Sequence, residues 1–239
     1  MIVKTPPARH NPAAMRQRTV ERMCQTLIDW RSAFHRNAPQ RSHQARAFTL
    51  IELLVVIAII AILIGLLFPA FRAVQNQAKQ TQAKNDLTQI VNAVNAYYTD
   101  YGKYPLVTAD TIYGPAGTPN NLLFNELRAT AAATQNPRQI VFINPPYVKT
   151  PANPRSGIAT QATTINGISV AINDYVDPWG TPYNVAIDGG YDNQLTNPYT
   201  ANTGAGPSPL AIGVIAWSRG RDQVQGTDFS ASDDVISWQ

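Results

Sequence analysis

Cysteine and histidine are scarce in this chain of 239 residues, and all of them lie near its N-terminal end. Cys24 is the single cysteine, and the three histidines precede residue 44. Residues 48–239 therefore offer no thiol nucleophile, no imidazole base and no soft metal ligand. Their composition excludes Cys–His and Ser–His catalysis, a zinc site built on Cys or His, and an internal disulfide.

Charge is also scarce, and its sign changes along the chain. Residues 1–47 carry nine Lys/Arg against Glu21 and Asp29, whereas residues 48–239 carry ten Lys/Arg against thirteen Asp/Glu. The formal net charge of +4 therefore belongs to the N-terminal segment. The sequence after residue 47 has no basic cluster that could bind phosphates, so we expect no nucleic-acid partner.

Phe48 to Phe68 form an apolar run that contains a single charged residue, Glu52. A helix of about 20 residues spans about 30 Å, so the run predicts a helix that crosses a membrane. The basic segment before it predicts that residues 1–47 stay in the cytoplasm and that the chain beyond about residue 70 is exported.

Glu52 needs a partner in such a helix, because a carboxylate at the centre of a bilayer costs about 2.5 kcal/mol or more. No Lys or Arg lies between Arg46 and Arg72. A free amine created by cleavage just before Phe48 would be the nearest cation. The sequence therefore predicts that Glu52 pairs with a new N-terminus.

The segment from Arg46 to Leu53 resembles the cleavage and methylation signature of type IV pilins and type II secretion pseudopilins. The resemblance implies that a prepilin peptidase cleaves between Ala47 and Phe48. It also implies that Phe48 is then methylated at its amino group, and that Glu52 pairs with an N-terminal amine in the assembled fibre. The family usually has Gly before the cleavage site, so Ala47 favours slower processing rather than its loss.

Residues 1–47 would be the basic leader that this cleavage removes from the cytoplasmic side. The leader is long for the family. Met15 and Met23 are alternative starting points of translation, and the residues upstream would then have no role.

Beyond the membrane run, apolar side chains recur at steps of three and four, which predicts a helix that continues for about eight turns. The stripe consists of Phe71, Val74, Ala78, Leu87, Ile90, Val91, Val94, Tyr97, Tyr98 and Tyr101. Gly102 and Pro105 are expected to end the helix. It then has a transmembrane and assembly half, residues 48–71, and an amphipathic half, residues 72–104. The resemblance implies that the second half packs beneath a small sheet.

Residues 105–173 are rich in proline and poor in charge, so regular structure is expected to be short there. We expect a helix over residues 121–133 and a short strand over residues 139–143. The region corresponds to the variable segment between helix and sheet in the family, and it is enlarged here. Two interpretations stay open, a surface insert and a surface that binds a partner.

Residues 174–239 are expected to form the sheet. The Asp-Pro-Trp-Gly motif at 177–180 predicts a tight turn that introduces a strand over 181–187, and residues 210–217 predict another strand. Together with the N-terminal signature, this turn resembles the major, or G-type, pseudopilin more closely than a generic pilin. The expected fold class is α+β, with one long N-terminal helix packed on a small, mainly antiparallel β-sheet.

An acidic loop near the C-terminal end holds four aspartates, namely Asp222, Asp228, Asp233 and Asp234. The loop resembles the calcium loop of G-type pseudopilins. Ca²⁺ takes about six to eight oxygen ligands, which carboxylates and main-chain carbonyls supply. The resemblance implies that Asp222 and Asp234 are the main ligands, that main-chain oxygens near Ser218 and Gln225 complete the shell, and that the other two aspartates are lesser candidates. The alternative is a solvated acidic turn without a metal.

The favoured function is a structural subunit of a type II secretion pseudopilus, and not an enzyme. The chain would cross the bacterial inner membrane once, keep its C-terminal domain in the periplasm, and polymerise into a helical homo-oligomeric fibre, periplasmic or extracellular, that drives protein secretion. Expected partners are the prepilin peptidase, minor pseudopilins and the inner-membrane assembly platform.

Two alternatives belong to other classes. A type IV pilin for adhesion, motility or DNA uptake would share the N-terminal half. A membrane-anchored hydrolase would use a pair of aspartates, but the adjacent Asp233 and Asp234 would point to opposite faces of an extended chain. Catalysis is therefore disfavoured.

Overall fold

The computed structural model describes residues 48–201 and 204–239, apart from the side chains of residues 69 and 70. The expected leader, including Cys24 and Ala47, lies outside the described residues. Contacts within the chain divide it into two units, Met1–Ile60 and Ala61–Gln239.

The described part of the first unit contains the beginning of helix α2 (Leu50–Tyr101). Every side chain from residue 48 to residue 60 is exposed, although most of them are apolar. Among the described residues, α2 is the one helix long and apolar enough to cross a membrane. A helix that is apolar all round and uncovered by its own chain is typical of a segment that lipid or other helices surround.

In the second unit, α2 continues to Tyr101 and ends at Gly102, as the sequence predicts. Gly102 has φ +67°, and its N–H donates to the carbonyl of Tyr98 at 2.8 Å. Glycine adopts this left-handed conformation without the steric cost that other residues meet there.

The buried face of α2 begins later than the sequence predicts. It consists of Ala83, Leu87, Ile90, Ala93, Val94 and Tyr97, which follow the helical repeat. Phe71, Val74 and Ala78, which belong to the predicted stripe, are exposed. The physical reason is that the core cluster on α2 starts at Ala83, and the described residues cover only part of the helix surface shortly before it.

The main sheet has four antiparallel strands in the order β1 (Thr111–Tyr113), β6 (Asn184–Ile187), β7 (Val214–Ser218) and β8 (Val235–Ile236). The register pairs Ile187 with Thr111 on one side and with Val214 on the other. A long helix followed by a small antiparallel sheet confirms the α+β fold class.

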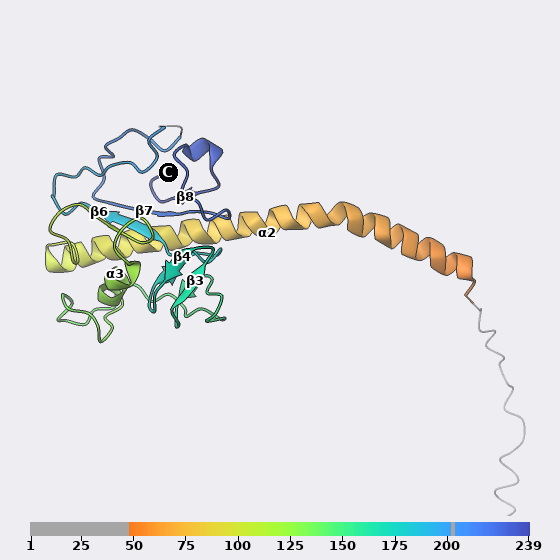
Figure 1. Cartoon of the computed structure of the whole chain (residues 1–239), viewed down its shortest axis with the longest axis horizontal. Helices are drawn as coiled ribbons and strands as arrows, with labels where there is room; N and C mark the ends of the chain where they lie inside the picture. The colour runs from red at the N-terminus through yellow and green to blue at the C-terminus, as the bar shows by residue number, and fades with distance from the viewer. Residues whose placement is uncertain (1–47, 202–203) are drawn as a thin grey trace, which may run out of the picture. The chain divides into compact units, whose positions relative to one another are not determined.

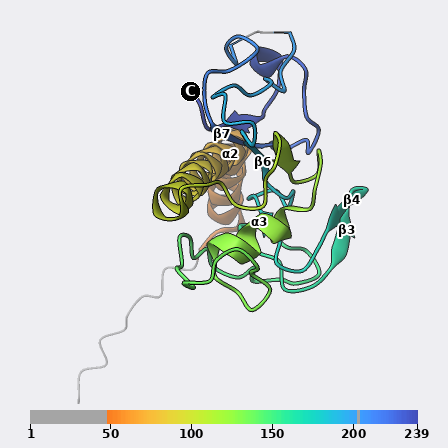
Figure 2. The ribbon, with the colours of Figure 1, turned by 90° about the vertical axis from the view of Figure 1, so that its left-hand side faces the viewer.

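The two faces of this sheet bury different sets of side chains, because successive residues of a strand point to opposite faces. Val185, Ile187, Val214 and Ala216 share a core with Leu87 and Ile90 of α2. The alternate residues Ala186, Ile215, Trp217 and Ile236 pack with Leu195, Tyr199 and Leu210 of the C-terminal loops. Strands β6 and β7 lie along α2, and the C-terminal loops lie on the other side of the sheet (Figures 1 and 2).

Helix α3 (Asn120–Leu127) stops earlier than the predicted helix over 121–133. Ala129 has φ +52°, which the helix cannot continue through. The predicted strand over 139–143 is wrong. Gln139 also has a positive φ, of +51°, and the N–H groups of Phe142 and Ile143 both donate to the carbonyl of Leu127 instead of to a neighbouring strand.

Two small sheets between residues 157 and 176 were not expected from the sequence. Strands β2 (Gly157–Ile158) and β5 (Tyr175–Val176) form one antiparallel pair, and β3 (Thr163–Ile165) and β4 (Ile168–Val170) form a hairpin. Asn166 and Gly167 connect the hairpin with φ values of +49° and +83°. An Asn-Gly pair favours this two-residue turn, because both positions need a positive φ.

Candidate functional site

The N-terminal acid Glu52 is held by hydrogen bonds at the start of α2. Its Oε2 accepts from the main-chain N–H of Thr49 at 2.8 Å and from the Thr49 hydroxyl at 2.7 Å. In return, the Glu52 N–H donates to the Thr49 hydroxyl oxygen at 3.2 Å. This reciprocal arrangement is a capping box, which satisfies free N–H groups of the first turn. Glu52 therefore has partners within its own chain, in addition to the N-terminal amine that the sequence predicts for the fibre.

The Asp-Pro-Trp-Gly turn is organised around the fully buried carboxylate of Asp177. Its Oδ1 accepts from the N–H groups of Trp179, Gly180 and Thr181 at 2.8, 2.7 and 2.9 Å. Its Oδ2 accepts from the hydroxyl of Ser218 at 2.6 Å. Burial raises the pKa of Asp177 to about 6, while these hydrogen bonds favour the charged form. The carboxylate thus joins the turn before β6 to the end of β7.

Gly180 is required where it stands in this turn. Its φ is +102°, and a Cβ at this position would lie 2.8 Å from the carbonyl oxygen of Pro154. Any side chain would therefore be strained and would collide with the backbone of the 105–173 region.

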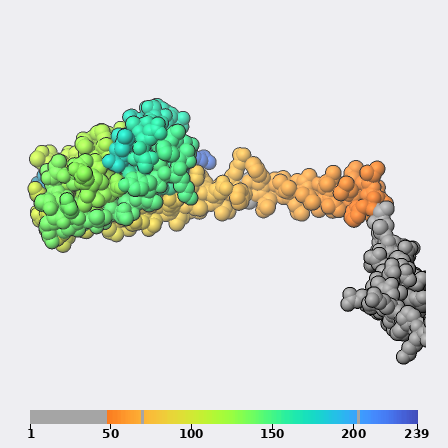
Figure 3. All heavy atoms as spheres, turned by 90° about the horizontal axis from the view of Figure 1, so that it is seen from below, coloured from red at the N-terminus to blue at the C-terminus, as the bar shows by residue number. Residues whose placement is uncertain are grey.

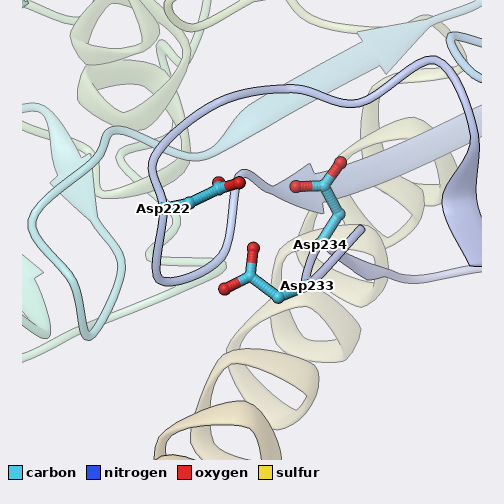
Figure 4. Close-up of side chains that lie close together, drawn as sticks. All are labelled: Asp222, Asp233 and Asp234. Atoms are coloured by element: carbon cyan, nitrogen blue, oxygen red, sulfur yellow. The ribbon is translucent and has the colours of Figure 1, made fainter. Parts of the chain in front are cut away.

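Three of the four predicted aspartates come together in the acidic loop (Figure 4). Asp222, Asp233 and Asp234 each place one carboxylate oxygen within 4.8 Å of the others. Asp222 is exposed, whereas Asp234 is only 7 % exposed. The Oδ1 atoms of Asp233 and Asp234 are buried and have no hydrogen-bond partner among the described residues. Three carboxylates at this spacing repel one another and offer an oxygen-only ligand set to a hard cation.

Asp234 is the most buried acid of this cluster, and it accepts two hydrogen bonds. Burial raises its pKa, and hydrogen bonds from the Tyr199 hydroxyl at 2.9 Å and the Gly226 N–H at 3.2 Å oppose this. The charges of Asp222 and Asp233 raise the pKa further. A bound cation would act in the opposite direction and favour the carboxylate.

The other predicted calcium ligands, Asp228, Ser218 and Gln225, do not place their side chains in this cluster. Asp228 is outside the cluster and caps the short 3₁₀-helix η1 (Phe229–Ala231), with its Oδ1 accepting from the Ser230 N–H at 3.0 Å. The Ser218 hydroxyl is bonded to Asp177, and the Gln225 Oε1 accepts from the Trp217 indole at 3.1 Å. The side chains of Ser218 and Gln225 are therefore engaged elsewhere, and their main-chain oxygens remain candidates only as the resemblance implies.

Sequence reasoning missed three contacts that support these groups. Thr49 carried a readable signal, because Thr-x-x-Glu before an apolar run is the pattern of a capping box. The Ser218–Asp177 bond joins positions 41 residues apart, and the Tyr199–Asp234 bond joins positions 35 residues apart. Neither long-range pair leaves a local pattern in the sequence.

One comparison with known families bears on this site. The model of the prokaryotic N-terminal methylation motif matches residues 42–68, which include Ala47, Phe48 and Glu52. Neither a curated protein nor a solved structure matches the chain. The single apolar helix and the motif together fit a protein that crosses the inner membrane once. The motif places the chain in the type IV pilin-like group of proteins.

Proposed function

We propose that the chain is a structural subunit of a type II secretion pseudopilus, processed between Ala47 and Phe48 and polymerised into a periplasmic fibre. The observation that carries the proposal is the methylation motif on an apolar helix that its own chain leaves exposed from residue 48 to residue 68. Lipid covers such a helix in the monomer, and the helices of neighbouring copies cover it in a fibre.

The C-terminal part supports a pseudopilin more than an adhesive pilin. The turn around Asp177 is bonded to the end of β7 by a hydrogen bond, residues 48–239 contain no cysteine for a disulfide, and three aspartates converge in the loop where calcium is expected. The second candidate is a type IV pilin, which the enlarged 105–173 region with its added hairpin favours. Neighbouring genes separate the two, because a pseudopilin lies with a secretin and a secretion ATPase, and a motility pilin with a retraction ATPase.

Processing gives the first test of this function. We expect the mature protein to begin at Phe48 with a methylated amino group, since residues 46–53 resemble the cleavage signature and the matched methylation motif includes them. Mass spectrometry of the N-terminal peptide, purified from membranes of the native host, measures this. A mature chain that retains Ala47, or one that begins after Phe68, would show that the motif does not direct processing.

We further propose that the acidic loop binds calcium, with Asp222 and Asp234 as the main ligands and Asp233 as a third carboxylate. Main-chain oxygens near Ser218 and Gln225 would complete the shell. The support is the convergence of three carboxylates and the two buried oxygens that lack a hydrogen bond. The ion would neutralise their repulsion and fix the loop that precedes β8.

Calcium should therefore raise the melting temperature of the full chain in detergent. A ligand that binds only the folded form stabilises it by about 2.7 kcal/mol when its free concentration is a hundred times its dissociation constant. Asp222→Ala and Asp234→Ala should each remove the shift between calcium and chelator. Asp228→Asn is the matched control, because it removes a charge of the same loop outside the cluster and should keep the shift. Equal melting temperatures with calcium and with chelator would contradict calcium binding and favour the interpretation of the loop as a solvated acidic turn.

A further inference from the structure

Three tyrosine rings form an exposed cluster at the C-terminal end of α2. The rings of Tyr98 and Tyr104 lie 4.7 Å apart between centroids, and Tyr191 stacks on Tyr104 at 5.6 Å with an angle of 15°. The Tyr191 hydroxyl accepts the main-chain N–H of Tyr104 at 3.0 Å, which fixes the pair. Tyr98 and Tyr191 are nevertheless 40 % and 50 % exposed, so ring surface is left open to a partner.

Three aspartates lie near Tyr191 in the sequence or are bonded to its neighbours, since Asp188 and Asp192 are close to it in the chain and the Gly190 N–H donates to Asp110 Oδ1 at 3.3 Å. The Oδ1 atoms of Asp110 and Asp188 each lie 3.6 Å from the point that a Cβ of Gly190 would occupy, so they converge on one place. Asp188 is only 2 % exposed, and its Oδ1 has no hydrogen-bond partner. Burial, the neighbouring Tyr98 and then the charge of Asp188 raise the pKa of Tyr104. The three tyrosines with Asp110, Asp188 and Asp192 are named the tyrosine–aspartate patch.

The aspartates of the patch form no ion pair with any of the residues that the structure describes. Among the residues that the structure describes, the two ion pairs are Arg138 with Asp100 and Arg221 with Asp233, and neither belongs to the patch. Lys103 precedes Tyr104 in the chain but forms no ion pair with these aspartates within that part of the chain. Carboxylates beside open aromatic faces attract a guanidinium or ammonium group.

The chain also exposes a complementary surface. Lys149 and Arg155 are exposed in the loop of residues 147–155, named the basic loop, and neither takes part in an ion pair among the described residues. The start of the loop is held because Tyr147 bridges to Ile158 and the Val148 N–H donates to the Ile158 carbonyl at 3.0 Å. Directly after its end, the Ser156 N–H donates to the Asp177 carbonyl at 2.9 Å. It belongs to the green and turquoise region that covers the face seen in Figure 3.

We propose that the tyrosine–aspartate patch of one copy receives Lys149 or Arg155 from the basic loop of the next copy. The proposal rests on the proposed function, because it places this contact in the fibre. Patch and loop are different surfaces of the same chain, so their contact is heterologous. A heterologous contact that does not close into a ring generates an open helical assembly, as a fibre requires. The charges also fix which copy can follow which.

Cysteine cross-linking of the assembled fibre tests the contact. Because Cys24 is the single native cysteine, no native thiol of residues 48–239 can react with the cross-linker. In a Cys24→Ser background, Asp110→Cys is combined with Lys149→Cys or with Arg155→Cys, and a short bis-maleimide is added to the full chain in host membranes. Because the contact is heterologous, at least one double variant should give a ladder of trimers and longer products, whereas each single variant should give none. Asp110→Cys with Val224→Cys, which is 63 % exposed on another loop, is the control pair and should give no ladder.

Fibres sheared from the same cells are counted in parallel. Fibres without a ladder in either double variant would overturn the contact and leave the proposed function intact, whereas a parent chain that forms no fibre would overturn both. Charge reversal gives a second readout. Asp110→Lys alone should lower fibre yield about fivefold, and Lys149→Asp or Arg155→Asp added to it should restore the yield. A loss that neither second change repairs would contradict the pairing.

Discussion

Replacement of Glu52 by valine is expected to leave membrane insertion intact and to abolish the ordered fibre. Removal of a carboxylate makes the apolar helix cheaper to place in lipid, so insertion should not suffer. In the fibre, the same change removes the acid that we expect to pair with the N-terminal amine of a neighbouring copy. Without that ion pair, nothing in the apolar run from Phe48 to Phe68 fixes the position of one helix along the next. Fractionation measures insertion, and the yield of sheared fibre measures assembly.

Thr49→Val is the control that separates assembly from helix capping. It keeps Glu52 charged and removes only the hydroxyl that shares the capping box. Loss of such a cap costs about 1 kcal/mol, which is small for a helix of 52 residues. We therefore expect near-normal fibre yield from Thr49→Val. A wild-type fibre yield from Glu52→Val, or an equal loss of fibre in both variants, would contradict the assembly role of Glu52 and leave it only the role of a helix cap.

Asp177→Ala is expected to destabilise the second unit severely. It would leave the N–H groups of Trp179 and Thr181 buried without their acceptor, whereas the Gly180 N–H would keep its bond to the main-chain carbonyl of residue 177 at 3.1 Å. Each unsatisfied group costs about 1–3 kcal/mol, so the free energy of unfolding should fall by about 2 kcal/mol or more. That is a large part of the roughly 5–15 kcal/mol that stabilises a typical domain. Chemical unfolding followed by tryptophan fluorescence measures the change.

Asp177→Asn is the matched variant, because its Oδ1 keeps the three acceptor bonds and the charge is lost. The pKa of Asp177 is about 6 in the folded chain against an ordinary value of 3.8, so the folded state holds the proton more tightly between about pH 4 and 6. The free energy of unfolding should therefore fall as the pH rises through this window and level off above it. Asp177→Asn should lack this part of the pH dependence. Parallel pH curves for the two chains, or a mild effect of Asp177→Ala, would contradict the role of the buried carboxylate.

Local patterns predicted the parts of the fold that depend on neighbours in the sequence. The helix to Tyr101, its end at Gly102 and the turn at 177–180 follow from periodicity and from glycine and proline chemistry. Strands β6 and β7 were predicted with starts three or four residues too early. The Asn166–Gly167 hairpin also carried a local signal, which the proline-rich surroundings concealed.

Other features depend on tertiary contacts and could not be read from one sequence. The buried face of α2 begins at Ala83 because the sheet reaches no further, which the periodic apolar stripe cannot show. Residues 139–143 have the composition of a strand, but no strand lies beside them and their N–H groups turn to Leu127. In the acidic loop, the resemblance to a calcium loop ranked Asp233 with Asp228. The fold brings Asp233 into the cluster and gives Asp228 to the cap of η1.

The late start of the core on α2 has a consequence for the state of the monomer before the proposed fibre assembles. Ala83 and the residues after it bury the sheet within one copy, while most described side chains between residues 61 and 82 stay uncovered. In the fibre that we propose, folding and assembly would therefore be successive steps, with a folded monomer held in the bilayer until a growing fibre takes it up. Extraction of a copy from the bilayer would then require no refolding of the second unit.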